Sequence, residues 1–280
     1  MPTSSMTVQA LENTMTHLAR SFVFVTLDQA ADILDGRLTF RRPAAVITFD
    51  DSLACLPTLA APLLFRMGIP ATFFVSTFAI DKAEPYWWLR LEYALAGAVT
   101  VAPMCLGLTG EELQSERDLA LPEWKRLLKR SPAALQMRIV KAIEDLLARS
   151  LSEALIDCPF GSPMSWDDVR QLGKLGMVVG SHSVTHPRME MLDITEIRQE
   201  LGESRLKIES EVGVPCVHFC YPYGSTNREI QDAARLAGYR SAVTTESPGW
   251  NYSQTPRLAL RRFGLPSAAH KLGYMLSRSK

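Results

Sequence analysis

Short apolar segments alternate with amphipathic helical segments along most of this chain, and this alternation constrains the fold more than any other feature. The apolar, β-branched run 44–49, which follows Pro43, predicts a buried strand. A helical pattern from about Leu56 to Met67 comes next, and the run 71–75 predicts a second strand. Strand, helix and strand in this order form a βαβ unit, which implies a parallel sheet.

The same pattern returns after residue 160. Asp193 with Glu196, and Thr226 with Glu229, have the spacing of capping boxes and predict the starts of two helices. A glycine follows each predicted helix, where a left-handed residue commonly ends it. The predicted strands are 177–180, 217–220 and 241–244, and the predicted helices are 166–175, 194–212 and 226–238.

A stretch of different character, about residues 81–163, separates these two parts. It opens with Pro85-Tyr86-Trp87-Trp88 and has helical patterns near 89–95 and 124–147. We interpret it as a helical insertion within one α/β domain that spans residues 1–280. Its leucine-rich helices fit a dimer interface and ordinary core packing equally well, so the sequence leaves the oligomeric state open.

Charge and cysteine content limit the class of protein. Lys plus Arg and Asp plus Glu both number 30, so no net field favours nucleic acid or an anionic membrane. An odd number of cysteines without a CxxC pair argues against a disulfide framework and for a reducing compartment. The first 20 residues lack the pattern of a signal peptide, and the apolar runs are too short to span a bilayer. We therefore expect a cytoplasmic protein without a transmembrane segment. The cysteines are Cys55, Cys105, Cys158, Cys216 and Cys220.

Three polar clusters follow predicted strands directly: Asp50-Asp51, the segment 182–186 and the segment 221–224. In α/β barrels the active site is built at the carboxyl ends of the strands. Each cluster alone has an ordinary explanation, namely a helix N-cap, a capping or solvent-facing histidine pair, and a turn. Together they predict a hydrolytic site.

His182 and His186, with one carboxylate, form a ligand set suited to zinc. Two adjacent carboxylates allow a division of roles, so we assign Asp51 as the third metal ligand and Asp50 as the catalytic base. Tyr223 can offer its backbone N–H to an oxyanion.

These clusters, in this order, resemble the motifs of the polysaccharide deacetylase family, carbohydrate esterases that include chitin, chitooligosaccharide and peptidoglycan deacetylases. Residues 48–51 resemble the first motif, 181–187 the second and 221–224 the end of the third, and the resemblance covers about 40–80 and 160–265. It implies a distorted, incomplete (β/α) barrel and a divalent metal, zinc first, with cobalt, nickel or manganese as alternatives. It also implies hydrolysis of N-acetyl groups on an amino sugar in a polysaccharide, oligosaccharide or lipid-linked glycan.

The chain also departs from the family pattern. The family has an arginine that steadies the catalytic aspartate where this chain has Cys220, and a glycine where it has Ser52. The closing region 257–263 offers no histidine as general acid, and His270 lies further on. A subgroup with a Trp-Trp insertion and a Leu-Pro-Arg-like ending is more similar, although Arg261 replaces that proline. These departures leave two alternatives: a catalytically degenerate glycan-binding module, and a deformylase or cyclic amidohydrolase on the same scaffold.

Other residues have weaker signals. Pro222 and Tyr223 are candidate substrate-binding residues, as are Trp87 and Trp88, which either stack on a sugar ring or pack the insertion, with packing favoured. His218 lies in an apolar strand and is expected in the core. Cys220 is expected to be a small residue at a strand end, without a basic neighbour.

Overall fold

The structure is a computed structural model of the chain, and it describes residues 6–97, 99–106, 118–151, 161–245 and 248–265. The chain divides into two compact units. The barrel unit comprises the described residues up to Lys82 and from Met164 onward, and the helical unit comprises Ala83–Pro163. The helical insertion was predicted at about 81–163.

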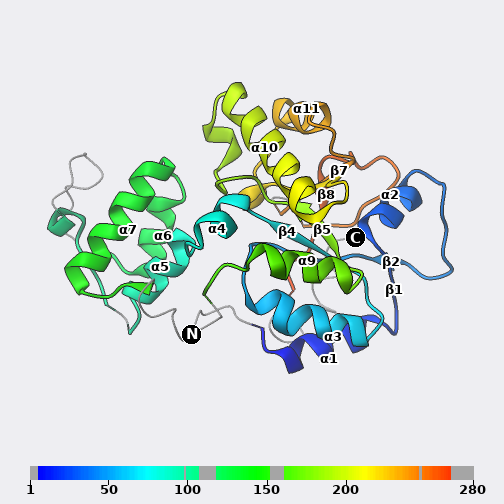
Figure 1. Cartoon of the computed structure of the whole chain (residues 1–280), viewed down its shortest axis with the longest axis horizontal. Coiled ribbons are helices and arrows are strands. Elements are labelled where there is room, and N and C mark those ends of the chain that lie inside the picture. Colours follow the sequence, from blue (N-terminus) through cyan, green and yellow to red (C-terminus); the bar gives the residue numbers. More distant parts are fainter. Residues whose placement is uncertain (1–5, 98, 107–117, 152–160, 246–247, 266–280) are drawn as a thin grey trace. The chain divides into compact units, whose positions relative to one another are not determined.

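The barrel unit is built on a parallel sheet of six strands that follow one another in chain order, so each strand pairs with the next one along the chain. This curled sheet forms a half-barrel, which confirms the predicted distorted, incomplete (β/α) barrel (Figure 1). Its strands are β3 (Ile47–Phe49), β4 (Ala71–Val75), β5 (Val178–Ser181), β6 (His218–Cys220), β7 (Ser241–Thr244) and β8 (Leu260–Arg261).

The predicted strand 44–49 is in fact two strands in different sheets. β2 (Ala44–Ala45) pairs in parallel with β1 (Val23–Phe24), whereas the chain joins the six-stranded sheet only at Ile47. Val46 lies between them and packs against a small cluster of buried residues that includes Phe74. The continuous apolar pattern could not reveal this change of partner, because both short strands are partly or fully buried.

Helices surround the sheet of the barrel unit (Figure 1). They are α1 (Val8–Leu18), α2 (Leu27–Leu34), α3 (Ala61–Arg66), α4 (Thr77–Lys82), α9 (Trp166–Lys174), α10 (Ile194–Val212) and α11 (Arg228–Leu236), with a π-helical turn at Leu56–Ala60 before α3. The capping box of α10 is confirmed, because the Asp193 side chain accepts hydrogen bonds from the backbone of Thr195 and Glu196. The predicted cap Thr226 is wrong: Asn227 caps α11 and accepts from the Ile230 N–H at 3.0 Å.

The buried core and the strand register of the barrel unit align the carboxyl ends of its strands. Phe73 of β4 and Phe219 of β6 are fully buried, together with Leu172 of α9 and Leu201 of α10. Strand register aligns Ser181, the last residue of β5, with Phe219. The loops after β3, β4, β5 and β6 therefore leave the same edge of the sheet.

The helical unit has a core of its own. It contains α5 (Trp87–Ala94), a 3-10 turn at Pro103–Leu106, α6 (Leu121–Leu128) and α7 (Ala133–Leu147), which bury Trp124 and Ile143 between them. Arg90 and Glu144 form a bidentate ion pair within this core, with Nε 3.0 Å from Oε1. The helical pattern near 124–147 corresponds to two helices, α6 and α7, and Pro132 is the residue just before α7.

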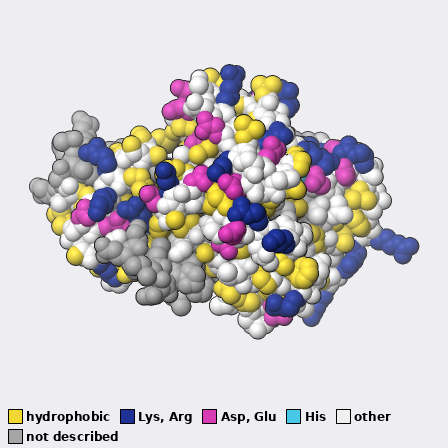
Figure 2. Space-filling model, viewed as in Figure 1, with side chains coloured by type: hydrophobic (Ala, Val, Ile, Leu, Met, Phe, Trp, Pro, Cys, Tyr) yellow, Lys and Arg dark blue, Asp and Glu magenta, His cyan; other side chains and the backbone are white. Residues whose placement is uncertain are grey.

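The surface carries both signs of charge. On the face shown in Figure 2, Lys and Arg side chains are interspersed with Asp and Glu, as the zero formal net charge leads one to expect. Among the described residues, none of the helices combines the length and the apolar character that crossing a bilayer requires.

Candidate active site

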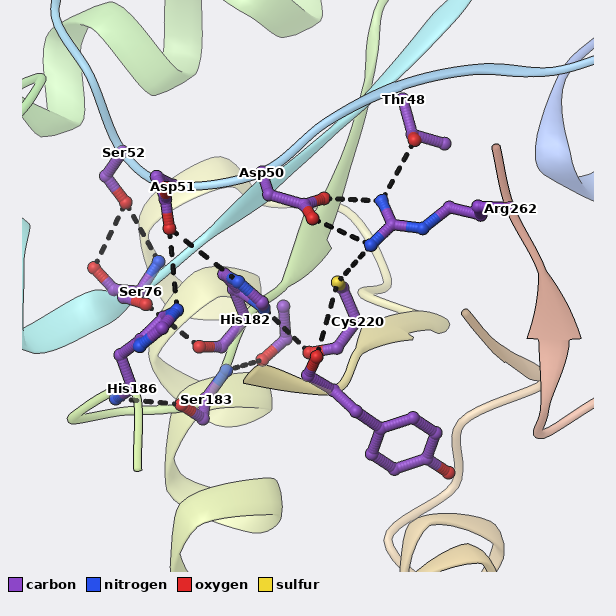
Figure 3. Close-up of polar contacts among 12 residues, drawn as sticks. Thr48, Asp50, Asp51, Ser52, Ser76, His182, Ser183, His186, Cys220 and Arg262 are labelled. Carbon is purple, nitrogen blue, oxygen red and sulfur yellow. Dashed lines mark hydrogen bonds and ion pairs between the residues drawn. The ribbon is translucent and has the colours of Figure 1, made fainter. Parts of the chain in front are cut away.

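The polar clusters that follow β3 and β5 meet at the carboxyl edge of the sheet (Figure 3). Asp51 Oδ1 lies 3.5 Å from His186 Nε2 and 3.8 Å from His182 Nε2. The ligand atoms of these three residues all lie within 4.8 Å of one another. Residues far apart in sequence thus point three donor atoms at one small volume, in the combination that the sequence predicted.

Hydrogen bonds hold the His182 imidazole and the backbone of His186 in place. His182 Nδ1 lies 2.7 Å from the backbone oxygen of Cys220, so this nitrogen carries the proton and donates it. Nε2 of the same ring is then free of hydrogen and faces Asp51, which is the usual arrangement of a metal-binding histidine. The backbone N–H of His186 donates to Ser183 Oγ at 3.0 Å.

Left-handed backbone conformations concentrate in these loops. Asp51, Ser183, His186 and Tyr223 all have positive φ, from 59° to 67°. Residues with a Cβ atom adopt this region only when surrounding contacts enforce it, and such strained residues cluster at functional sites. The turn that brings each of these side chains to the site therefore depends on tertiary contacts rather than on local preference.

The three donor groups fit a divalent metal ion. Ligand atoms bound to one zinc ion at about 2.1 Å lie about 3–3.5 Å apart, close to the separations found here. Burial lowers the pKa of both His182 and His186, so both rings are neutral and able to bind a metal at neutral pH. Burial, with the nearby charge of Asp50, raises the pKa of Asp51 to about 7 in the absence of an ion. A cation beside Asp51 would relieve this unfavourable charge.

Arg262 holds the second aspartate. Its Nη1 and Nη2 donate to Asp50 Oδ1 at 2.6 Å and Oδ2 at 2.7 Å, a bidentate pair (Figure 3). Nη1 also donates to Thr48 Oγ1 at 3.0 Å, and Nη2 lies 3.1 Å from Cys220 Sγ. Burial alone raises the pKa of Asp50, but the guanidinium outweighs it and lowers this pKa to about 2.

Sequence reasoning missed Arg262 altogether. The expectation that Cys220 has no basic neighbour is wrong, since the Arg262 guanidinium contacts its sulfur atom. The pKa of the Cys220 thiol is nevertheless raised well above its ordinary value, because burial and the charge of Asp50 outweigh the arginine. Arg262 directly follows β8, and a strand of two residues has no periodicity by which it could be recognised.

Ser52 links three loops of the site. Its side chain is fully buried, and its Oγ accepts a hydrogen bond from the backbone N–H of Ser76 at 2.9 Å. Ser76 Oγ in turn donates to the backbone oxygen of His182 at 2.9 Å. A glycine at position 52 would lack the first of these bonds, so the departure from the family pattern has a structural use here.

Tyr223 lies beside the histidines. It occupies a 3-10 turn (Pro222–Gly224) that follows β6, and its ring packs edge-on against the His186 ring with the centroids 5.0 Å apart. Pro222, the first residue of this turn, is buried. The structure thus brings Asp50, Asp51, His182, His186 and Tyr223 together at one edge of the sheet.

The remaining candidates belong to other segments of the chain. Trp87 is buried in the core of the helical unit, and the ring of Trp88 stacks on Tyr86 with the centroids 4.3 Å apart, so their binding of substrate stays a prediction. His218 is fully buried at the opposite end of β6 and bonds to Ser241 Oγ at 2.9 Å, which confirms the expected core position. His270 lies outside the described residues.

Comparisons with known proteins agree with this geometry. The sequence pattern of the polysaccharide deacetylase family matches residues 37–242. No curated protein matches the chain in sequence.

Among solved structures, the deacetylase PplD of Streptococcus pyogenes in complex with acetate has a TM-score of 0.60 at 14% identity, over 96% of this chain and 83% of that one. The BpsB deacetylase domain of Bordetella bronchiseptica has 0.59 at 18%, over 94% and 85%. IcaB of Ammonifex degensii has 0.59 at 16%, over 98% and 92%. At such identities these likenesses concern the fold alone.

Proposed function

This chain belongs to the polysaccharide deacetylase family, and from this membership and the geometry of the site we propose that it is a metal-dependent hydrolase. It removes N-acetyl groups from an amino sugar in a polysaccharide, oligosaccharide or lipid-linked glycan. The observation that carries the proposal is the convergence of Asp51, His182 and His186 beside an aspartate that takes no part in that ligand set.

Asp51, His182 and His186 would hold the metal ion, with zinc as the proposed ion, through one carboxylate oxygen and two neutral Nε2 atoms. A divalent ion bound there supplies Lewis acidity to an amide carbonyl and makes water more acidic. The chain itself contributes the orientation of the ligands, because the Cys220 carbonyl fixes the His182 ring and Ser183 fixes the backbone of His186.

Asp50 is the catalytic base of the proposed mechanism. Its carboxylate lies beside the ligand set and takes the proton of the attacking water molecule. Arg262 holds both oxygens of that carboxylate, which limits rotation about the side-chain bonds and keeps one face toward the reacting water. The departing amine needs a proton, and the one held by Asp50 is at hand. Amide and water then become amine and acetate, with no other reactant.

Tyr223 contributes to the acyl end of the substrate. Its left-handed backbone takes the chain away from the regular course of β6, and its ring lies against the His186 ring. We assign its backbone N–H as a donor to the oxyanion that develops on the acetyl carbonyl. Pro222 and Tyr223 together form the wall that contacts the acetyl group.

The alternative of a glycan-binding module without catalysis loses one of its two reasons. It rested on two absences: the arginine that steadies the catalytic base, and a histidine that acts as general acid. Arg262 makes with Asp50 the contact that the residue at position 220 does not make. Loss of one supporting group from a catalytic set lowers the rate by orders of magnitude and leaves measurable chemistry, so a hydrolase remains the better proposal.

The test is release of acetate from short N-acetylglucosamine oligomers, measured after chelation and again after zinc or cobalt is restored. Asp50→Asn should keep the bound metal and lose acetate release, whereas Asp51→Asn should lose both. Asp232→Asn, at a partly exposed position of α11 that pairs with Arg228 and Arg235, is the matched control and should behave as wild type. Metal binding without acetate release from any N-acetylated sugar would reject the substrate class, and undiminished release by chelated protein would reject the metal.

A further inference from the structure

The loop between the two metal-ligand histidines is held from outside the site by one carboxylate. Ser183 and His186 have φ of 67° and 59°, which residues other than glycine rarely adopt. The loop leaves β5 and contains no regular secondary structure up to the 3-10 turn at Met189–Met191. Its conformation therefore depends on contacts with a neighbouring element.

That element is α10. Glu200 Oε2 accepts hydrogen bonds from the backbone N–H of Val184 at 2.8 Å and of Thr185 at 3.0 Å. Glu200 Oε1 accepts a third from Thr185 Oγ1 at 2.6 Å. In the described part of the chain, every side-chain hydrogen bond of Glu200 goes to this loop. Hydrogen bonds to an ionised carboxylate are among the stronger ones in proteins.

The helix that carries Glu200 is itself well fixed. Its first turn is capped by Asp193, and Ile197 and Leu201, which flank Glu200 in sequence, are buried in the main core. One turn later, Ser204 bonds to Ser181 Oγ at 2.8 Å, at the end of β5 just before His182. The loop is thus attached to α10 both before the first histidine and between the two.

We propose that Glu200 is a positioning residue for the metal site: it holds the segment between His182 and His186 in its left-handed turns, so that both Nε2 atoms face Asp51. This inference rests on the metal site of the proposed function. Without Glu200, the two backbone N–H groups turn toward water and the loop relaxes from its strained conformation. The His186 ring then leaves the position in which it completes the ligand set.

A metal-binding titration tests the inference without any substrate. The probe is Co²⁺, whose visible absorption reports the number and geometry of its ligands, added to chelated protein at pH 7.5. We expect wild type to bind one equivalent. Glu200→Ala should bind at least tenfold more weakly and show an altered absorption spectrum, since loss of groups that orient metal ligands typically costs 10- to 100-fold in affinity.

Two further variants separate positioning from general destabilisation. Glu200→Gln keeps one carbonyl oxygen that can accept from both backbone N–H groups, so it should restore affinity to within about threefold of wild type. Glu203→Ala, on the exposed face of the same helix, should bind Co²⁺ as wild type does. Circular dichroism confirms that each variant is folded at the temperature of the titration.

Each outcome bears on a different statement. Equal affinity and spectrum of Glu200→Ala and wild type would overturn the positioning role while leaving the metal site in place. If Glu200→Ala does not fold, Thr185→Ala removes only the Oγ1 bond and should lower affinity by a smaller factor; no change there would also overturn it. Failure of wild type to bind Co²⁺ would overturn the metal site of the proposed function, and this inference with it.

Discussion

Replacement of Arg262 by methionine removes the guanidinium while keeping an unbranched side chain in the same space. The variant leaves Asp50 without its bidentate partner, in a place where 31% of the Asp50 side chain and 14% of the Arg262 side chain is exposed. Removing one partner of a fully buried ion pair costs about 3–5 kcal/mol, because the other charge stays desolvated. Since the carboxylate retains some access to water, we expect about 2–3 kcal/mol of lost unfolding free energy at pH 7.

The pKa of Asp50 leads to a similar magnitude. A carboxyl whose pKa falls from 3.8 to about 2 on folding, in spite of its burial, is stabilised in its charged form by roughly 2.5 kcal/mol. Because the folded-state pKa is the lower one, this contribution is fully present above pH 3.8 and is lost as the pH falls toward 2. Without the guanidinium, burial raises the pKa of Asp50 in the folded variant above 3.8, so the variant regains stability by protonation first, and the difference between wild type and Arg262→Met should shrink as the pH falls from 7.

The assay is a double-mutant cycle of Arg262→Met and Asp50→Asn, followed by urea unfolding of metal-free protein. We expect a coupling free energy of about 2 kcal/mol at pH 7. Arg261→Met, on the neighbouring exposed residue of β8, serves as the control and should change stability by less than about 0.5 kcal/mol. A coupling below about 0.5 kcal/mol would show that the pair contributes no more than an ordinary surface ion pair, and the positioning of the base by Arg262 would have to be abandoned.

Three further predictions concern the surroundings of the site. Cys220→Arg should restore part of the acetate release lost in Arg262→Met, because an arginine at position 220 starts beside the same carboxylate; acetate release equal to the single variant would contradict this. Gly180→Ala should destabilise the protein by about 1–3 kcal/mol in urea unfolding, since a Cβ would lie 2.6 Å from the buried Phe74 ring; wild-type stability would show that the ring can move aside. Burial lowers the pKa of His218, so the unfolded chain binds the proton first, and stability falls as the pH drops below about 6.5. His218→Gln should therefore reduce the loss of stability between pH 6.5 and 5 in the metal-free protein by up to about 1.4 kcal/mol per pH unit, and an unchanged slope would contradict it.

The sequence predicted the parts of this protein that depend on local pattern. The parallel sheet, the ends of α10 and the placement of two aspartates and two histidines beyond strand ends follow from apolar periodicity and from residues with strong positional preferences, whereas the incomplete barrel was implied by the family resemblance. The division at Val46 and the break at Pro132 show the limit of this approach. In both places the backbone changes direction over a few residues, while the apolar pattern of the sequence continues without a break.

The residues that complete the site were beyond prediction for a related reason. Arg262 and Glu200 bear on the site through contacts, and an arginine after a two-residue strand or a glutamate at a half-buried helix position has no pattern that distinguishes it from its neighbours. β8 pairs with β7 in the structure, but a strand of two residues could not be recognised in the sequence, so its position beside β7 could not be predicted either. Cys220 was the one available signal. A small side chain where the family has an arginine leaves an empty space and a carboxylate without its partner, so another cation has to fill the space and pair with the carboxylate. Arg261 and Arg262 follow one another at the end of the barrel, and the alternation of side chains along a strand directs them to opposite faces, so that only one of the two reaches Asp50.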